Sequence, residues 1–449
     1  MRDNPASANR AFPALAALSL TMLLPSLGTS IANIGLPAMA QAFGTSFAHV
    51  QWVVLAYLLA MTATIVSAGR LGDLAGRRSV MLAGTGIFVL GSALCAVAPT
   101  LGALLAARAL QGLGAAAMMA LTMALASEAV PKERMGSAMG VLTTMSAVGT
   151  ALGPSLGGLL LARFGWQALF LVNLPLGIAA LALGAATLPL PAPRGGANVR
   201  FDHMGTVTLA LALAAYALAA TSGGWAGAGL LAIAALAGTL FVMAEKRAPA
   251  PLVRLSMLRT PALGAGFAAS TLVSSVVMAT LVTGPFYLAT AMQLAPARLG
   301  LVMSIGPVVA ALTGAPAGRL ADRFGAAAIT IAGLFIILLG TAGFAAAPAR
   351  LGLPGYVVPL VLVTAGYGLF QASNNTAVMA AVAQDERGVA SAILTLARNL
   401  GLVSGASVMG ALFASGGMRL TYAVAAGMVI AAVVLVSAAR ATTARASQA

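Results

Sequence analysis

Long apolar segments recur along this chain of 449 residues, and they limit its fold more than any other feature. A helix that crosses a membrane needs about 20 mostly apolar residues. Only 7% of the residues are charged and 60% are hydrophobic, which is outside the usual range of soluble proteins. The sequence therefore predicts an all-α polytopic membrane protein. Charged and Pro/Gly-rich breaks divide it into fourteen candidate spans, at 12–36, 47–69, 80–98, 100–127, 136–162, 167–188, 205–222, 226–244, 263–290, 297–317, 326–346, 354–382, 388–414 and 419–439.

The positive charge is distributed in a way that indicates orientation in a membrane. The net charge is +15, but the Lys and Arg residues are scattered between apolar segments, whereas nucleic-acid-binding proteins cluster them on one face. With the amino terminus placed inside, most of the 24 cations are cytoplasmic, and the opposite span ends hold Arg163, Arg298, Arg350 and Arg419. The positive-inside rule therefore predicts an even number of spans and two cytoplasmic termini. The expected location is the inner or plasma membrane. The first apolar segment is too long for a cleaved signal and is expected to be retained.

One internal repeat suggests how the spans are organised. GRLGDLAGRR at 69–78 returns as GRLADRFGAA at 318–327, an offset of 249 residues that preserves G-R-L-x-D-x-x-G. Because the copies are eight candidate spans apart, they face the same side of the membrane, as in membrane proteins built from parallel repeats. We expect a six-helix bundle at 1–188, linkers with an inserted helix pair at 189–262, and a second six-helix bundle at 263–449.

Each copy of this motif combines glycines, an aspartate and arginines in what the sequence predicts to be one short interfacial loop. Carboxylate and guanidinium groups can pair bidentately there, and such a pair can hold two helix ends in one state and release them in another. A positive-inside loop would explain the arginines but neither Asp73 nor the second copy. The residues predicted to gate are Gly69, Arg70, Asp73, Gly76, Arg77, Arg78, Gly318, Arg319, Asp322 and Arg323.

Polar side chains inside the spans are candidates for a binding path. Arg108 lies roughly 12 Å into its span at about 1.5 Å per residue. An Arg near the bilayer centre costs at least about 2.5 to 3.5 kcal/mol, so it should face the bundle interior or a water-filled cavity. Arg398 lies near mid-membrane in the second half. The amides Gln111, Gln371, Asn374, Asn375 and Asn399 could line the same path or only hold helices together.

The segment GTALGPSLGG at 149–158 predicts close contact between helices. Gly149, Gly153 and Gly157 are spaced by four and form a ridge without side chains, and Gly158 extends it. Pro154 lacks the N–H that would bond the carbonyl one turn earlier, so we expect the helix to bend there. Ordinary small-residue packing explains part of this pattern; a bend at which the bundle moves is the further expectation.

The sequence lacks the residues that several kinds of chemistry require. No G-x-x-x-x-G-K-[ST] motif is present, so direct ATP-driven pumping is not expected. His49, His203 and Cys95 are the only histidines and the only cysteine, which leaves no set of ligands for a metal cluster and no pair for a disulfide. No G-x-S-x-G or His-based triad can be assembled within the membrane. The sequence predicts no enzyme, no cofactor and no metal.

These motifs resemble those of major facilitator superfamily transporters, in the fourteen-helix drug:proton antiporter branch. GRLGDLAGRR resembles the loop between helices 2 and 3, RALQGLGAA the helix 4 motif, and GTALGPSLGG the helix 5 motif that marks exporters. RFGWQALFLVNLPLG and GVASAILTLARNLG also look like that branch. The resemblance covers nearly the whole chain. It implies multidrug efflux by rocker-switch alternating access, with Asp73 and its arginines gating the cytoplasmic side and Arg108 lining the path.

The chain departs from this branch on its first helix. Relatives typically carry L-D-x-T-I-V-N-V-A-L-P there, and Gly28 stands where their Asp stands, while Ser30 and Asn33 could still line a path. The nine acids all map to loops or span ends, and Glu128 among them is the candidate for proton coupling, for which a substrate's own proton is the alternative route. With Arg108 and Arg398 unopposed by a carboxylate, the cavity should be electropositive and prefer neutral or anionic compounds over lipophilic cations.

Alternative functions remain open at this stage. Within transport, the chain could be an uncoupled facilitator or a specific metabolite or organic-anion exporter. A membrane sensor or a lipid-acting enzyme is a remote alternative, because the paired motifs argue for a moving gate and no soluble signalling segment is evident. The expected partners are a small molecule, protons if export is coupled to them, and the lipid bilayer. No nucleic acid is expected, and the protein is expected to be a monomer.

Overall fold

The computed structural model describes residues 5–130, 135–188, 203–222, 224–247, 255–346, 351–382 and 387–446, and these are helical with short turns. Contacts divide the chain into two compact units. Unit 1 consists of Met1–Ser46 and Trp52–Leu213, and unit 2 of Phe47–Gln51 and Ala214–Ala449. The division falls inside a helix of the predicted inserted pair. The described part of the chain has no strand, which confirms the predicted all-α fold class.

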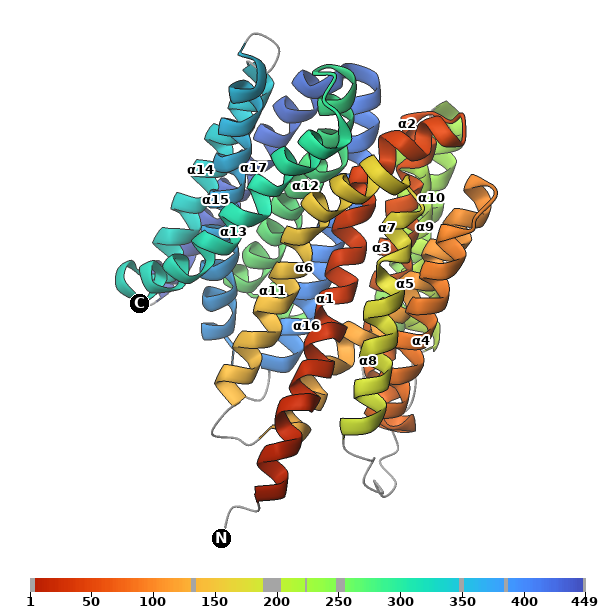
Figure 1. Ribbon diagram of the computed structural model, residues 1–449. Coiled ribbons are helices and arrows are strands. Elements are labelled where there is room, and N and C mark those ends of the chain that lie inside the picture. The colour runs from red at the N-terminus through yellow and green to blue at the C-terminus, as the bar shows by residue number, and fades with distance from the viewer. Residues whose placement is uncertain are drawn as a thin grey trace. The chain divides into compact units, whose positions relative to one another are not determined.

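Unit 1 is a bundle of long helices (Figure 1). Its helix α1 packs mainly against α6, while α3 and α4 both pack against α5. Thr100 caps the start of α5, since its hydroxyl accepts a hydrogen bond from the Ala103 N–H at 3.2 Å. The helices are α1 (Pro5–Ala42), α3 (Trp52–Ala75), α4 (Arg77–Ala96), α5 (Leu101–Ala129), α6 (Met135–Phe164), α7 (Ala168–Leu171), α8 (Asn173–Thr187) and the first part of α9 (His203–Thr221).

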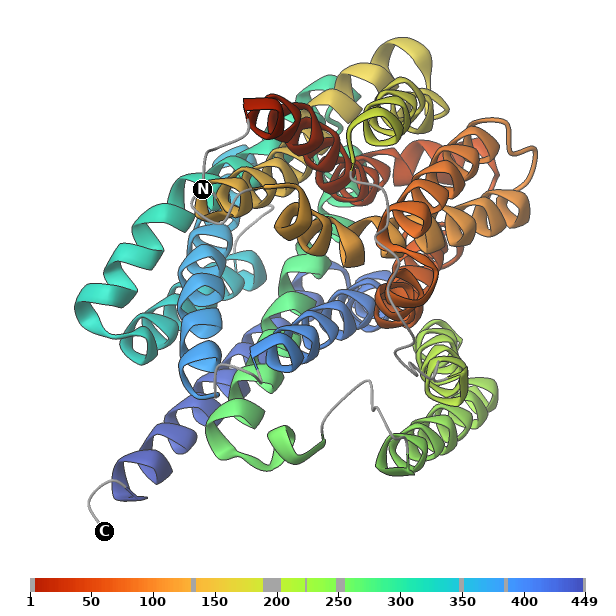
Figure 2. The same cartoon turned by 90° about the horizontal axis from the view of Figure 1, so that it is seen from below.

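Unit 2 is a second helical bundle, which Figure 2 shows from below. In this unit α14 packs mainly against α15, and α12 packs against both α16 and α17. Its elements are α2 (Phe47–Val50), the remainder of α9, α10 (Gly224–Arg247), α11 (Leu255–Arg259), α12 (Pro261–Thr290), α13 (Pro296–Phe324), α14 (Ala326–Ala346), α15 (Gly352–Ala380), α16 (Arg387–Ser404), a π-helix η2 (Gly405–Met409) and α17 (Gly410–Ala446).

The number of helical segments long and apolar enough to span a membrane is 13 within the described ranges. The last of them runs for 54 residues, Val389–Thr442. At about 1.5 Å per residue this would reach about 80 Å, far beyond the roughly 30 Å hydrocarbon core. The backbone leaves helical geometry at Gly417, where φ is 62° and ψ is −161°. The segment therefore holds two spans, which agrees with the predicted division into 388–414 and 419–439.

The prediction of a loop at each motif copy is wrong. Helix α3 continues through the first copy to Ala75 and α4 begins at Arg77, so Gly76 alone joins them. Likewise Gly325 alone joins α13 to α14. Both glycines have positive φ, 94° for Gly76 and 86° for Gly325, and L side chains rarely adopt this conformation. The other motif residues adopt helical geometry, so the helix is interrupted only at the residue with positive φ.

The internal repeat extends into the packing of each unit. Gly333 stands 249 residues after Gly84, the offset of the two motif copies. In unit 1, a Cβ on Gly114 of α5 would lie 2.5 Å from the Gly84 carbonyl oxygen of α4. In unit 2, a Cβ on Gly333 of α14 would lie 2.8 Å from the Gly366 carbonyl oxygen of α15. The same close helix crossing therefore occurs in both units.

Some of the sequence-based expectations fall outside the described residues. The two predicted linkers fall mostly at 189–202 and 248–254, which are not among the described residues. Arg350 is also outside them. The same holds for five of the nine acids, Asp3, Glu133, Asp202, Asp385 and Glu386.

Candidate functional site

Arg108 is buried inside unit 1, with an exposed fraction of 0%. Its Nε donates to the Val53 carbonyl at 2.8 Å, and Nη1 lies 3.3 Å from the Gly28 carbonyl. The guanidinium lies over the Tyr57 ring, 4.3 Å from the centroid. Among the described residues no carboxylate lies within ion-pair distance of Arg108, and Nη2 has no hydrogen-bond partner. A desolvated cation is thus held by carbonyl dipoles and an aromatic face, with the two N–H groups of Nη2 left without a partner.

Gln111 connects Arg108 of α5 to helix α4. Its Oε1 accepts from Arg108 Nη1 at 2.5 Å, and its Nε2 donates to the Ser92 hydroxyl at 2.7 Å. Gln111 is fully buried as well. The resulting network, Ser92 of α4 with Gln111 and Arg108 of α5, reaches α1 through the Gly28 carbonyl. Arg108 and Gln111 therefore act together, as their spacing of three residues predicts.

Ser30 and Asn33 lie elsewhere on α1. The Ser30 hydroxyl donates to the Gly149 carbonyl of α6 at 3.2 Å, and Ser30 is 3% exposed. The Asn33 amide donates to the Thr29 carbonyl at 3.0 Å, while its Oδ1 is buried without a partner. Neither side chain bonds Arg108 or Gln111, so the predicted path residues of unit 1 form two separate groups.

The glycine ridge of α6 lies directly against α1. A Cβ on Gly149 would lie 2.5 Å from the Leu23 carbonyl oxygen, and one on Gly157 would lie 2.9 Å from Ile31 Cγ1. A Cβ on Gly153 would overlap Ser30 Oγ. Pro154 and Gly158 are buried, and α6 continues through them as one helix. The sequence predicted this close approach; the bend at Pro154 stays a prediction.

The first motif copy forms a charge cluster, defined by Asp73, Arg77 and Glu128. Arg77 Nη2 lies 2.7 Å from Asp73 Oδ1, and Arg77 Nη1 lies 3.0 Å from Glu128 Oε1. The three side chains are partly exposed, between 26% and 43%. Arg78 points to α8 instead, where Nη2 donates to the Ala185 carbonyl at 2.5 Å. The cluster therefore ties the ends of α3, α4 and α5 together, and it contains the proposed coupling residue.

The second motif copy is built differently. Arg319, Asp322 and Arg323 are exposed on the last turns of α13. Arg323 lies over the Phe324 ring, 5.2 Å from its centroid. The ion pairs of the described chain are those of Arg77, so none joins these three side chains. Ala326 and Ala327 occupy the places that Arg77 and Arg78 hold in the first copy, which removes the partner for the aspartate.

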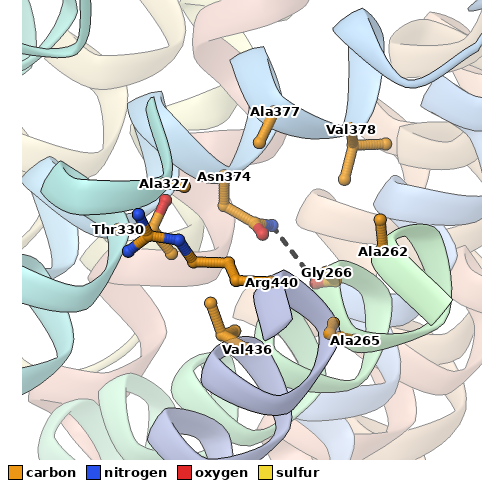
Figure 3. A pocket seen from close by; sticks show the side chains of 11 residues that line it. Ala262, Ala265, Gly266, Ala327, Thr330, Asn374, Ala377, Val378, Val436 and Arg440 are labelled. Atoms are coloured by element: carbon orange, nitrogen blue, oxygen red, sulfur yellow. Dashed lines mark hydrogen bonds between the residues drawn. The ribbon is translucent and has the colours of Figure 1, made fainter. Parts of the chain in front are cut away.

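The amides of α15 fall into two arrangements. Gln371 Nε2 donates to Asn375 Oδ1 at 3.1 Å along the helix, whereas Asn374 Nδ2 donates to the Gly266 carbonyl of α12 at 3.2 Å. Asn374 also lines a cavity of about 330 Å³ within unit 2 (Figure 3). On α16, Asn399 is 2% exposed, and Arg398 is partly buried with its Nε lacking a partner.

Sequence reasoning missed three residues of these sites. Tyr57 covers Arg108 and donates from its hydroxyl to the Pro25 carbonyl at 3.0 Å. Ser92 receives the Gln111 amide, and Arg440 lines the cavity of unit 2. Tyr57 and Ser92 are polar groups within apolar spans, but each span holds other hydroxyl side chains, so the sequence does not single them out. Within the described part of the chain, no group of His, Cys, Asp and Glu could hold a metal ion.

Comparisons with known proteins agree on one family. A family model described as Major Facilitator Superfamily matches residues 18–406, and a further match covers 267–449. Riboflavin transporter RibZ of Clostridioides difficile is 31% identical over 405 residues, which cover 90% of this chain and 88% of that protein. Multidrug resistance protein Stp of Mycobacterium tuberculosis is 32% identical over 408 residues, 89% of this chain and 75% of that protein.

Two further comparisons concern a relative that is named for export and a solved structure with a similar fold. The tetracenomycin C resistance and export protein of Streptomyces glaucescens is 30% identical over 415 residues, 90% of this chain and 76% of that protein. A solved structure of the nucleoside transporter NupG has a TM-score of 0.70 at 14% identity and covers 95% of this chain and 99% of that one. At this identity the likeness concerns the fold alone.

Proposed function

This chain belongs to the Major Facilitator Superfamily, and from that premise we propose that it exports small amphipathic molecules across the cell's inner or plasma membrane. Membership makes it a multi-pass transporter and not an enzyme. Two of the relatives described above are named for resistance to drugs or for export. The glycine ridge of α6, which resembles the exporter motif, supports the same direction. The proposed cycle is alternating access by a monomer whose termini are both cytoplasmic.

The proposed substrate class rests on one observation: the positive charge of Arg108 has no carboxylate partner among the described residues. A buried guanidinium without a carboxylate creates a positive potential, because low-dielectric surroundings screen it poorly. Nη2 has no partner but is buried in this conformation, so in the proposed cycle it donates to a substrate oxygen when the bundle opens, while Gln111 holds the group in place. Arg108, Gln111, Ser30 and Asn33 in unit 1, with Gln371, Asn374, Asn375, Arg398 and Asn399 in unit 2, are the proposed path. The favoured substrates are neutral or anionic.

Compound accumulation in cells with and without the gene tests this proposal. Cells that carry the protein should accumulate less of anionic and neutral dyes than cells without it, with little difference for an ethidium-like cation. Arg108→Gln should reduce anion export about tenfold or more, since a charge-assisted hydrogen bond of about 1.5–3 kcal/mol is lost. Arg163→Gln, an exposed arginine at the end of α6, is the matched control and should export normally. Strong cation export that survives Arg108→Gln would refute the proposed substrate class.

The charge cluster of Asp73, Arg77 and Glu128 is the proposed cytoplasmic gate of unit 1. Partly exposed ion pairs are weak enough to break and re-form during a transport cycle. Glu128 is also the proposed route for protons, since protonation of its carboxylate would remove one of the two partners of Arg77. Gly69, Gly76, Arg70 and Arg78 in the first copy, and Gly318, Arg319, Asp322 and Arg323 in the second, complete the proposed gating set.

A specific metabolite exporter is the second candidate. The observation that favours a metabolite as the substrate is the 31% identity to the riboflavin transporter RibZ over 90% of this chain. A specific metabolite would be exported with saturable competition by close analogues, whereas a multidrug exporter would handle unrelated structures. Transport with and without an imposed pH gradient separates an uncoupled exporter from a proton antiporter.

A further inference from the structure

Unit 2 contains a cavity at the end where α12 and α14 begin and α15 and α17 finish. Its volume is about 330 Å³, and Figure 3 shows the side chains around it. The walls are small and apolar, and the polar groups are Thr330, Asn374 and Arg440. Arg440 extends from α17 toward Thr330 across the cavity (Figure 3). The volume lies near the lower end of those found for small-molecule sites.

Comparison with unit 1 shows why this space is open. At the corresponding place in unit 1, Met81 and Val80 of α4 pack with Leu18, Leu121 and Leu188 in a closed apolar core. Thr330 stands 249 residues after Met81, and Ala327 stands 249 residues after Arg78.

The two units also differ in where their cation comes from. In unit 1 the guanidinium of Arg78 reaches the Ala185 carbonyl beside this core. In unit 2 smaller side chains leave a hollow, and the cation comes from α17 instead of from the motif. The two halves of the repeat therefore differ here in side-chain size and in the source of the cation.

Among the residues that the structure describes, no carboxylate forms an ion pair with the cation of this cavity. Arg440 forms no hydrogen bond or ion pair with any residue that the structure describes. Asn374 uses one N–H on the Gly266 carbonyl and keeps a second, since an amide nitrogen carries two. The helix ends contribute little net potential, because two amino ends and two carboxyl ends meet here. The cavity thus offers one cation and an amide donor beside apolar walls.

We propose that this cavity binds the phosphate of an anionic phospholipid, with Arg440 as its cationic partner and Asn374 as a second donor. The position at the helix ends places the guanidinium at the depth of lipid headgroups, and basic pockets between membrane helices bind such groups. The apolar walls formed by Ala265, Val378 and Val436 favour a ligand with methylenes over a free ion. In the proposed orientation the lipid belongs to the cytoplasmic leaflet.

Native mass spectrometry of the purified full-length protein tests this site. Protein exchanged into mixed micelles with phosphatidylglycerol should retain one lipid much more tightly than protein in micelles with phosphatidylcholine. Arg440→Gln should weaken phosphatidylglycerol retention about tenfold, since one charge-assisted contact is lost. Ala327→Leu keeps the arginine but fills the cavity, and should weaken retention similarly. Arg259→Gln, an exposed arginine at the end of α11, is the matched control and should retain the lipid.

Three outcomes would overturn the proposal. One is equal retention of the lipid by Arg440→Gln and the unchanged protein. The second is equal retention of the two lipids. The third is displacement of the lipid by an excess of inorganic phosphate, which would assign the site to a free anion. Arg440→Lys should fold and restore retention partly, which separates loss of charge from loss of structure. Because lipid retention is measured without transport, failure here leaves the proposed export function untouched.

Discussion

The Gly28 carbonyl accepts a hydrogen bond from Arg108, a fully buried cation that has no carboxylate within ion-pair distance among the described residues. An aspartate introduced there would have its Cβ 3.2 Å from Phe88 Cζ and 3.8 Å from Gln111 Nε2. The ring must move by a few tenths of an ångström, which the tip of a side chain can do. The substitution would therefore place an acid beside the Arg108 and Gln111 network.

We predict that Gly28→Asp changes the charge preference of export. The carboxylate should pair with Arg108 and cancel its potential, so anionic export should fall about tenfold for each 1.4 kcal/mol of lost attraction. Export of an ethidium-like cation should rise in the same cells. Gly28→Asn has nearly the same shape without the charge and should leave the preference as it is. Efflux of paired anionic and cationic dyes measures this, and parallel changes in both variants would contradict it.

At the scale of single residues, the sequence indicated that Arg108 is important but did not indicate which groups bind its guanidinium. The cost of burying Arg108 predicted that it would face the bundle interior. Its partners are the carbonyls of Val53 and Gly28, and every residue has a carbonyl, so no pattern in the sequence singles these out. For Ser30, the path role stays a prediction, and the structure adds a contact that no pattern in the sequence specifies: its hydroxyl donates to the Gly149 carbonyl of α6.

The contact between α1 and α6 depends on the absence of side chains at the glycine ridge. We predict that Gly153→Ala destabilises the protein by about 1–3 kcal/mol, since the added methyl group overlaps Ser30 and forces the helices apart. Gly140→Ala on the same helix adds its methyl group in open space and should be neutral or slightly stabilising. Thermal unfolding of the purified variants measures the difference. Equal melting temperatures would show that α1 and α6 can separate freely.

The charge cluster joins the ends of three helices, and its two carboxylates can be tested separately. We predict that Glu128→Gln abolishes transport driven by a pH gradient in vesicles, while Asp73→Asn slows transport but keeps its pH dependence. Neither should change stability by more than about 1 kcal/mol, because exposed ion pairs are worth little. Proton-driven transport that stays intact in Glu128→Gln would exclude Glu128 as the coupling residue.

The helical elements were largely predictable, and their exact ends were not. Apolar runs located the spans because the hydrocarbon core sets their length. The motif copies were expected to be loops, but charged residues at a membrane surface can continue a helix, so α3 and α13 extend through them to a single glycine each. The charge cluster also needed the structure, since Glu128 is 51 residues from Arg77 along the chain.

For the molecule as a whole, the placement of cations predicts an even number of spans and cytoplasmic termini. We expect cysteines introduced at Arg163 and Arg419 to react with a membrane-impermeant maleimide in intact cells. Cysteines at Arg247 and Arg440 should react only after the cells are permeabilised. All four residues are exposed, and the buried Cys95 would be replaced by alanine in the background. The reverse labelling pattern would invert the orientation and the leaflet assigned to the cavity of unit 2.

The sequence by itself determined that this chain lies in a membrane as two repeated helical bundles, because span length, cation placement and an offset of 249 residues are all properties of order along the chain. The tertiary structure alone decided which side chains meet. Arg108 is held by carbonyls, Arg77 joins two carboxylates, and Arg440 enters a hollow that Ala327 leaves open. These contacts depend on how helices far apart in sequence cross, and helix crossings are set by the shapes of the packed surfaces.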